Sequence, residues 1–403
     1  MDPSADADRL DQIYRLLALC ARAEGHPALY DALQTRLEAF TAWEHLPDEA
    51  ERHGMSALLW HHLRQSGLVI PSESEHMLAV LYLRQRALNR LHTQALLQTC
   101  ALLEDRGIRP LLLKGLALAY QYYPEPALRT VSDLDLLLAA SEMAPAVEAL
   151  LAAGYTVQEL EGDLSASPPP AEIRLLAPAV SGTRTPVELH HGQVGRLPLH
   201  GPMRDAELAG LYAAPQSLEI SGRQILVPAP AAAFDYLLRH FQRHLFEASS
   251  GRPLPLKWVA DILSMVERHA AESAWSDRLR HDKPLRERLQ VLYSLTPVPA
   301  HLAQLFPVHA DPPPAGVNRY PGGWPRDTYR RRSQEGPLHF ILQTWAVPSA
   351  WWLRLHYGIS QRACWWYGAV VHPLFVLGLM ARGLARRLRR GAWQLLRSAP
   401  GPA

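Results

Sequence analysis

The sequence is short of cysteine and of net charge, and each shortage excludes a class of protein. Three cysteines, Cys20, Cys100 and Cys364, are spread over 403 residues. They are odd in number and far apart, so they form neither a disulfide framework nor a CxxC pair for a metal or redox centre. We therefore expect a reducing, cytoplasmic setting. The formal net charge is only +2, which predicts no overall attraction to nucleic acid.

The N-terminus also lacks the features of a secretory signal. Residues Met1 to Asp8 are polar and acidic, whereas a signal begins with basic residues and continues with an apolar run. What the chain does have is an ordinary globular composition, with 48% hydrophobic and 20% charged residues, which supports a sizeable core. From its length we expect two or three domains.

The C-terminal segment has no acidic residue after Glu335. It is rich instead in tryptophan and arginine: Trp345, Trp351, Trp352, Trp365, Trp366, Trp393, Arg382, Arg386, Arg387, Arg389, Arg390 and Arg397. This composition is typical of a membrane interface and is attracted to anionic lipid. We predict peripheral contact of residues 345–397 with the inner face of the membrane, because His372-Pro373 interrupts the uncharged window. The main alternative is a buried helix with a basic, solvated end. A nucleic-acid-binding arm is a third hypothesis, which the tryptophan-rich apolar composition disfavours.

Hydrophobic periodicity divides the chain into five parts. We expect an N-terminal helical region (1–106), an α/β core (107–227), a helical region on the substrate side (228–295), a Pro/Gly-rich linker or loop (296–344) and an aromatic, basic helical tail (345–403). In the first part, helices are predicted over Leu10–Ala23, Glu49–Gln65 and Ser72–Asp105. In the core, strands are predicted over Ile108–Leu113, Val131–Leu138, Tyr155–Leu160, Ile173–Leu176 and Pro186–His190.

Two aspartates in the predicted strand Val131–Leu138 carry the strongest chemical signal. Residues i and i+2 of a strand point to the same face, so Asp133 and Asp135 project together while Leu134 and Leu136 face the core. Neighbouring carboxylates repel each other, and a divalent cation offsets that cost. Mg²⁺ is commonly held by one or two carboxylates together with substrate phosphates. The alternative without a metal site is a strand with two solvated aspartates at its end.

The surrounding residues favour the metal site over that alternative. Lys114-Gly115 follows a buried strand, where the glycine permits close approach to a phosphate and the lysine supplies a charge. Arg129 is placed to reach a triphosphate or to pair with a carboxylate. On the strand Pro186–His190, Glu188 and His190 share one face, and Glu188 supplies a third acidic group. His190 either orients a carboxylate or simply ends the strand.

These residues resemble a known family. The resemblance rests on an ordered set of stretches: Leu113-Lys114-Gly115-Leu116-Ala117-Leu118-Ala119, Tyr122-Tyr123, Arg129, Asp133-Leu134-Asp135-Leu136-Leu137, the His53-Gly54-Met55 helix, Glu188-Leu189-His190, a helix with His240, and a helix with Trp258 and Asp261. From about Glu49 to about Val266, the chain is similar to the bacterial uncharacterised nucleotidyltransferase family of the DNA polymerase β-like superfamily.

The resemblance implies an α+β fold, with a small mixed-sheet nucleotidyltransferase core flanked by N-terminal and C-terminal helical regions. It implies metal ligands at Asp133, Asp135 and Glu188, with Glu188 helping to activate the attacking hydroxyl. Lys114, Gly115 and Arg129 would bind the nucleotide. One departure is Leu116, since the superfamily usually places a serine or threonine after the glycine, where its hydroxyl contacts a phosphate.

Two further groups of residues either belong to the site or only pack in the fold. His240 and His244 are four apart on a predicted helix, so they share a face. They lack the glutamate of a zincin motif, and we interpret them as partly buried histidines facing the catalytic domain. The alternative is that they contact the nucleotide or the acceptor. Trp258 is interpreted as packing at the start of a helix, with Asp261 pairing locally, and the alternative is that Lys257 lines the acceptor groove.

The sequence therefore predicts an Mg²⁺-dependent enzyme, with Mn²⁺ as the alternative ion. It would transfer a nucleoside monophosphate from ATP or another NTP to an unidentified acceptor: a small molecule, a saccharide, a protein or an RNA end. The main alternative is a catalytically inactive scaffold or regulator that binds membrane or protein partners. Modification of nucleic-acid ends is a third hypothesis, which the near-neutral charge disfavours.

Overall fold

The computed structural model describes residues 3–160, 170–191, 205–248, 255–306, 350–378 and 381. The helices are α1 Pro3–Leu19, α2 Pro27–Glu38, α3 Leu46–Arg52, α4 Ser56–Ser66, α5 Ser72–Glu104, α6 Leu116–Tyr122, α7 Met143–Ala152, α8 Asp205–Ala213, α9 Pro230–Ala248, α10 Lys257–His269, α11 Ser273–His281, α12 Lys283–Tyr293, α15 Ala350–Tyr357 and α16 Cys364–Trp366. The strands are β1 Leu111–Leu112, β2 Leu134–Leu137, β3 Thr156–Leu160, β4 Glu172–Leu176, β5 Pro186–His190, β6 Gln216–Ile220 and β7 Arg223–Val227.

The seven strands form one mixed sheet in the order β3-β4-β5-β2-β1-β7-β6. β2 runs parallel to β5 and β1 runs parallel to β7, whereas every other neighbouring pair is antiparallel. The predicted α+β fold with a mixed sheet and flanking helices is confirmed. The β6–β7 hairpin was not predicted. It turns at Ser221 and Gly222, both with positive φ.

The two faces of the sheet have different partners. One face packs against α5, α6 and α7 in a cluster that includes Leu96, Leu116, Leu134, Leu150 and Leu189. The other face meets α8 and α9 through a smaller cluster that contains Leu137, Leu211 and Tyr236. Side chains that alternate along β2 and β5 therefore point either into the main core or toward α9.

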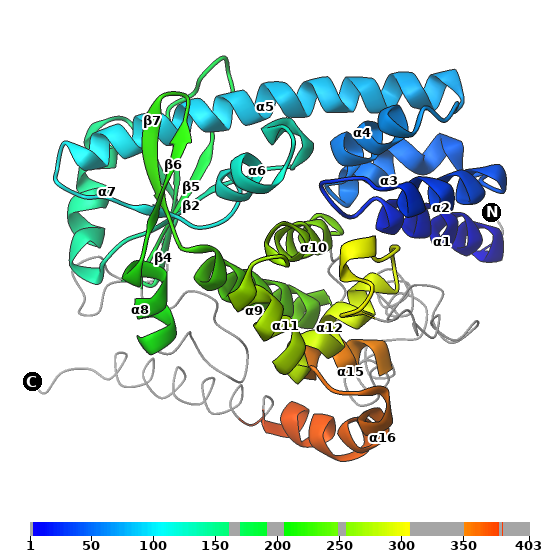
Figure 1. The fold of residues 1–403 in the computed structure, drawn as a ribbon. Helices are drawn as coiled ribbons and strands as arrows, with labels where there is room; N and C mark the ends of the chain where they lie inside the picture. Colours follow the sequence, from blue (N-terminus) through cyan, green and yellow to red (C-terminus); the bar gives the residue numbers. More distant parts are fainter. Residues whose placement is uncertain are drawn as a thin grey trace, which may run out of the picture.

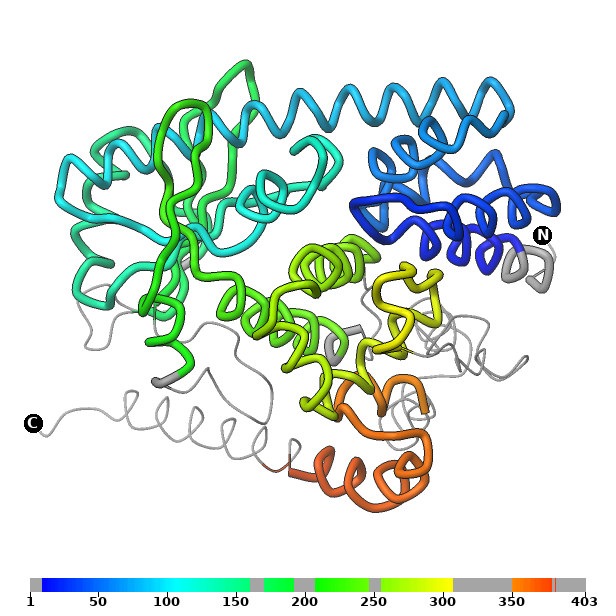
Figure 2. The backbone as a smooth tube through the Cα atoms, viewed as in Figure 1, coloured from blue at the N-terminus to red at the C-terminus, as the bar shows by residue number. Residues whose placement is uncertain are grey.

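A helical body adjoins the sheet. Its core joins α1, α3 and α4 to α9, α10, α12 and α15, which come from opposite ends of the chain. Figure 2 shows these blue, green, yellow and orange segments side by side. The 33-residue α5 connects the body to the sheet, because its first half packs on α3 and α4 while residues Ala95–Leu103 pack on the sheet (Figure 1).

The predicted helix Glu49–Gln65 is interrupted in the structure. α3 ends at Arg52 and α4 begins at Ser56, with Gly54 between them at φ +67°. Glycine populates this left-handed region without a steric cost, so it can end one helix and redirect the chain into the next. The His53-Gly54-Met55 stretch is therefore a turn and not a helix.

Parts of the predicted linker and tail are packed in the helical body. Thr296, Leu302 and Phe306, from the start of the predicted linker, are buried. So are the apolar residues of α15, where the Trp352 indole donates to the carbonyl of Leu245 on α9. The rest of the linker, the Pro-rich piece Ser165–Pro170 up to Pro169, and the basic end 382–403 lie outside the described residues. Among the helices described, none combines the length and the apolar character needed to cross a membrane.

Candidate functional site

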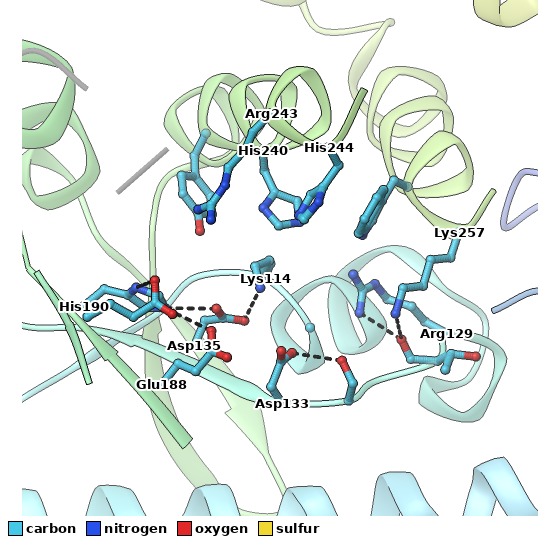
Figure 3. Close-up of a pocket in the computed structure, with 16 residues that line it drawn as sticks. Lys114, Arg129, Asp133, Asp135, Glu188, His190, His240, Arg243, His244 and Lys257 are labelled. Carbon is cyan, nitrogen blue, oxygen red and sulfur yellow. Dashed lines mark hydrogen bonds and ion pairs between the residues drawn. The ribbon is translucent and has the colours of Figure 1, made fainter. Parts of the chain in front are cut away.

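The register of the parallel strands β2 and β5 brings an acidic group together. Asp135 lies directly opposite Glu188, and His190 follows on the same face of β5. One ligand atom from each of these three residues lies within 4.8 Å of the others. They point away from the core formed with α5 and toward α9 (Figure 3). The two carboxylates at this spacing suit a metal ion, and His190 lies beside them.

Cationic groups surround the carboxylate of Asp135, which is 1% exposed. Lys114 Nζ donates to Oδ2 at 2.6 Å, and His190 Nε2 lies 3.1 Å from Oδ1. Burial alone would raise the pKa of Asp135, but Lys114 and His190 together hold it well below its usual value. Burial would lower the pKa of His190, yet its contacts with Asp135 and Glu188 raise that pKa to about 9. At neutral pH this histidine is therefore a hydrogen-bond donor.

Asp133 lies at the edge of this acidic group. It immediately precedes β2, is partly exposed and accepts a hydrogen bond from Ser132 Oγ at 3.2 Å. It lines the same pocket as Asp135 but is not among the three residues whose ligand atoms converge. The predicted strand began at Val131, whereas the observed strand begins at Leu134. Asp133 therefore lies outside the regular alternation that the sequence argument assumed.

The Lys114-Gly115 turn lies between β1 and α6. Gly115 has φ +59°, and a Cβ added there would lie 3.3 Å from the carbonyl oxygen of Asp133. The turn therefore needs glycine both for its backbone conformation and for its approach to the aspartate strand. Leu116, at the position where the resemblance led us to expect serine or threonine, is fully buried among the side chains between α5 and the sheet. A residue at this position faces the core and not the pocket.

Arg129 lines the pocket, but its charge is already matched. Its Nε and Nη2 donate to the two carboxylate oxygens of Asp261 at 2.7 and 2.8 Å. Tyr123 also donates to Asp261 at 2.7 Å. Arg129 is 4% exposed and Asp261 is 1% exposed. Asp261 therefore pairs across the fold and not locally as the sequence suggested, and this network ties α10 to the turn before β2.

A second wall of the pocket comes from α9 and α10. Tyr236, His240 and His244 follow one another at four-residue intervals along α9, and Trp258 stacks on His244 with ring centroids 4.1 Å apart. Burial, together with Lys114 and His244, lowers the pKa of His240 well below its usual value, so this imidazole is neutral at pH 7. Lys257 completes the wall.

The two walls enclose a pocket of about 260 Å³ that brings together all six predicted site residues. The prediction missed five other lining residues: Thr130, Ser132, Glu172, Tyr236 and Arg243. Tyr236 could have been found, because it extends the His240–His244 spacing by one more turn. Glu172 could not, since it reaches the pocket only through the pairing of β4 with His190 on β5.

Comparison with known proteins identifies a family and similar solved structures. A family model described as uncharacterised nucleotidyltransferase matches residues 41–302. A crystal structure of an antigenic nucleotidyltransferase-like protein from Paracoccidioides brasiliensis is similar at 15% identity and a TM-score of 0.28. That similarity covers 48% of this chain and 88% of the other. No curated protein matches the sequence.

Proposed function

Since this chain belongs to the uncharacterised nucleotidyltransferase family, we propose that it transfers a nucleoside monophosphate from an NTP to an acceptor in the pocket between β2, β5, α9 and α10. The observation that carries the proposal is the convergence of Asp135, Glu188 and His190 opposite Lys114 and Lys257. Phosphoryl-type transfer depends mainly on positioning and on stabilising negative charge, and such a site supplies both.

The residues present fit a divalent cation. Each carboxylate oxygen of Asp135 accepts one hydrogen bond, so each keeps a second lone pair that can bind an ion. Glu188 is only partly buried, so its carboxylate faces the pocket. Asp135 and Glu188 would hold the ion, with Asp133 at the edge and His190 beside them. Mg²⁺ or Mn²⁺ suits this oxygen-rich set, and once bound it would neutralise charge on the transferred phosphate.

The protein's own groups have separable roles in this proposal. His190 fixes the orientation of the Asp135 carboxylate through its hydrogen bond. Glu188 accepts the proton of the attacking acceptor hydroxyl. Lys114, on the Gly115 turn, supplies positive charge to the phosphates. Arg129 holds α10 against the pocket through Asp261, so we assign it a positioning role in place of direct phosphate contact.

Calorimetric titration of ATP, GTP, CTP and UTP with Mg²⁺ tests the proposal, together with release of pyrophosphate from the preferred NTP. Wild-type protein should bind at least one NTP in a metal-dependent manner, and Asp135→Asn should abolish that binding. Asp277→Asn is the matched control, because Asp277 is exposed on α11. Equal binding by wild type and Asp135→Asn would overturn the proposal.

The scaffold alternative makes the opposite prediction. A protein that keeps the fold only to bind partners would retain its cellular role when Asp133→Asn and Asp135→Asn are combined. A nucleotidyltransferase would lose that role completely. Complementation of a deletion strain by the double variant therefore separates the two functions.

For the C-terminal segment, we propose peripheral contact with anionic lipid. Trp365, Trp366, Leu374 and Leu377 are between 48% and 72% exposed, and the arginine run follows them in the sequence. Exposed aromatic and apolar side chains beside basic residues suit a membrane interface. Wild-type protein should co-float with phosphatidylserine vesicles and not with phosphatidylcholine vesicles. Equal flotation of Trp365→Ala/Trp366→Ala would contradict the proposal.

A further inference from the structure

Lysine is rare in this protein and concentrated at the pocket. The sequence contains 38 arginines and only three lysines, Lys114, Lys257 and Lys283. Lys114 and Lys257 both line the pocket, whereas Lys283 is exposed at the start of α12. An ammonium is a compact point charge that differs from the planar guanidinium used elsewhere. The second pocket lysine belongs to none of the interactions assigned so far.

The ammonium of Lys257 has little to neutralise it. Lys114 is paired with Asp135, and Arg129 is paired with Asp261. In the described part of the chain, no carboxylate lies within ion-pair distance of Lys257. Lys257 Nζ makes a long hydrogen bond of 3.5 Å to the carbonyl oxygen of Thr130. Arg129 Nη1 donates to the same oxygen at 3.4 Å (Figure 3).

An ammonium held in this way is costly for the fold. Lys257 is partly buried, and a charge held away from water without a partner of opposite sign is destabilising. Burial, with a further contribution from Arg129, lowers its pKa to about 8, while the charges of Asp133 and Asp261 oppose that shift and the charge of Lys114 adds to it. An anionic ligand in the pocket would supply the missing countercharge.

The turn at Gly54 holds this lysine in place. The backbone N–H of Lys257 donates to the carbonyl of His53 at 3.2 Å, and Thr130 Oγ1 donates to the carbonyl of Gly54 at 3.1 Å. A Cβ added at Gly54 would lie 2.8 Å from Cδ of Lys257. The aliphatic stem of the lysine therefore crosses the bare backbone of the glycine on its way to the pocket.

We propose that Lys257 binds the polyphosphate of the nucleotide, and that Gly54 is the positioning residue that directs the lysine to it. The proposal rests on the proposed nucleotidyl transfer and names the group that recognises the donor from the helical side. Lys114 contacts the polyphosphate from the sheet side. The His53-Gly54 turn thus connects the N-terminal helices to nucleotide recognition.

Inorganic tripolyphosphate with Mg²⁺ is the probe, because it lacks a nucleoside. Titration into the full-length protein should show Lys257→Met binding about tenfold or more weakly than wild type, as expected for loss of a charge-assisted contact. Lys283→Met, a lysine change outside the pocket, should bind within about twofold of wild type on the same scale. No binding by wild type, or equal binding by Lys257→Met, would overturn the proposal.

A pair of glycine variants isolates the role of Gly54. Gly54 and Gly67 have the same φ of +67°, but a Cβ at Gly67 would meet nothing within 4 Å. Both alanine variants place a Cβ at the same φ, but only the Cβ at Gly54 meets Lys257. Gly54→Ala should weaken tripolyphosphate binding several-fold more than Gly67→Ala. Adding Gly54→Ala to Lys257→Met should cause no further loss, whereas a merely structural role would give additive losses.

The same titrations separate failure of this inference from failure of the proposed function. Lys257-dependent binding of tripolyphosphate by a protein that releases no pyrophosphate from any NTP would support the inference and reject transfer. Pyrophosphate release with the same KM for NTP in wild type and Lys257→Met would support transfer and reject the inference. Lys257→Arg, which keeps the charge, should recover part of the affinity if the charge is what matters.

Discussion

Two buried charge clusters lie beside each other at the pocket, and they differ in how completely they are satisfied. In one cluster, Arg129 makes a two-point ion pair with Asp261, which Tyr123 completes. In the other, Asp135 pairs with Lys114 and His190, Glu188 lies near His190 and Arg174, and both carboxylates face an open pocket. The closed cluster stabilises the fold, and the open cluster is available to a ligand. Burial of a charge therefore does not by itself mark a functional residue.

The largest expected effect is loss of stability when the closed cluster is broken. Asp261→Asn leaves the Arg129 guanidinium buried without a matching charge, which should cost about 3–5 kcal/mol. Asp135→Asn should cost less, because Lys114 can be solvated from the pocket. Urea unfolding of both variants and wild type measures the difference. Similar free energies of unfolding for the two variants would contradict the claim that the closed cluster contributes more to stability than the open cluster.

The next effect concerns Gly115 and Leu116, the glycine of the Lys114-Gly115 turn and the residue that follows it. Gly115 faces the aspartate strand, whereas Leu116 faces the core. Introducing a hydroxyl by Leu116→Ser should lower stability by about 2–5 kcal/mol, as for other truncations of buried leucine. It should not improve nucleotide affinity, since the side chain points away from the pocket. Thermal unfolding and NTP titration of the variant test both statements, and tighter NTP binding would contradict the second.

The smallest expected effect is a pH dependence of tripolyphosphate binding to the pocket, caused by titration of Lys257. The pKa of Lys257 is lowered to about 8, so the protonated, phosphate-binding form predominates below pH 8 and is lost as pH rises through that value. Tripolyphosphate affinity should therefore fall by up to about tenfold between pH 7 and pH 9. Lys257→Arg stays charged over this range, and titration of the ligand is common to both proteins. Identical pH profiles would contradict the prediction.

Local patterns in the sequence were enough to predict the acidic wall. The strand Pro186–His190 and the alternation of Asp135 with its apolar neighbours were correctly predicted, because a strand with one buried face fixes its own side-chain directions. The turn at Gly115 was equally readable from its residue types. These features depend on a few consecutive residues and on simple geometry.

The partners of these residues could not be predicted, because they depend on tertiary packing. Arg129 was expected to contact phosphate, but α10 brings Asp261 to it from 132 positions away. Nothing local to Lys257 indicates that its stem crosses Gly54. The β6–β7 hairpin did leave a signal, since Ser221-Gly222 is a two-residue turn of the kind that joins antiparallel strands.

The turn at Gly54 also bears on when the pocket comes into existence during synthesis. The pocket needs the carbonyl of His53, the Lys114 turn, β5 and the start of α10 together, a span of about two hundred residues. Contacts so distant in sequence form late, because the long loop between them must first be closed. A nascent chain on the ribosome therefore lacks the complete pocket until α10 has emerged. The pocket can therefore be complete once α10 has emerged, well before the last of the 403 residues is added.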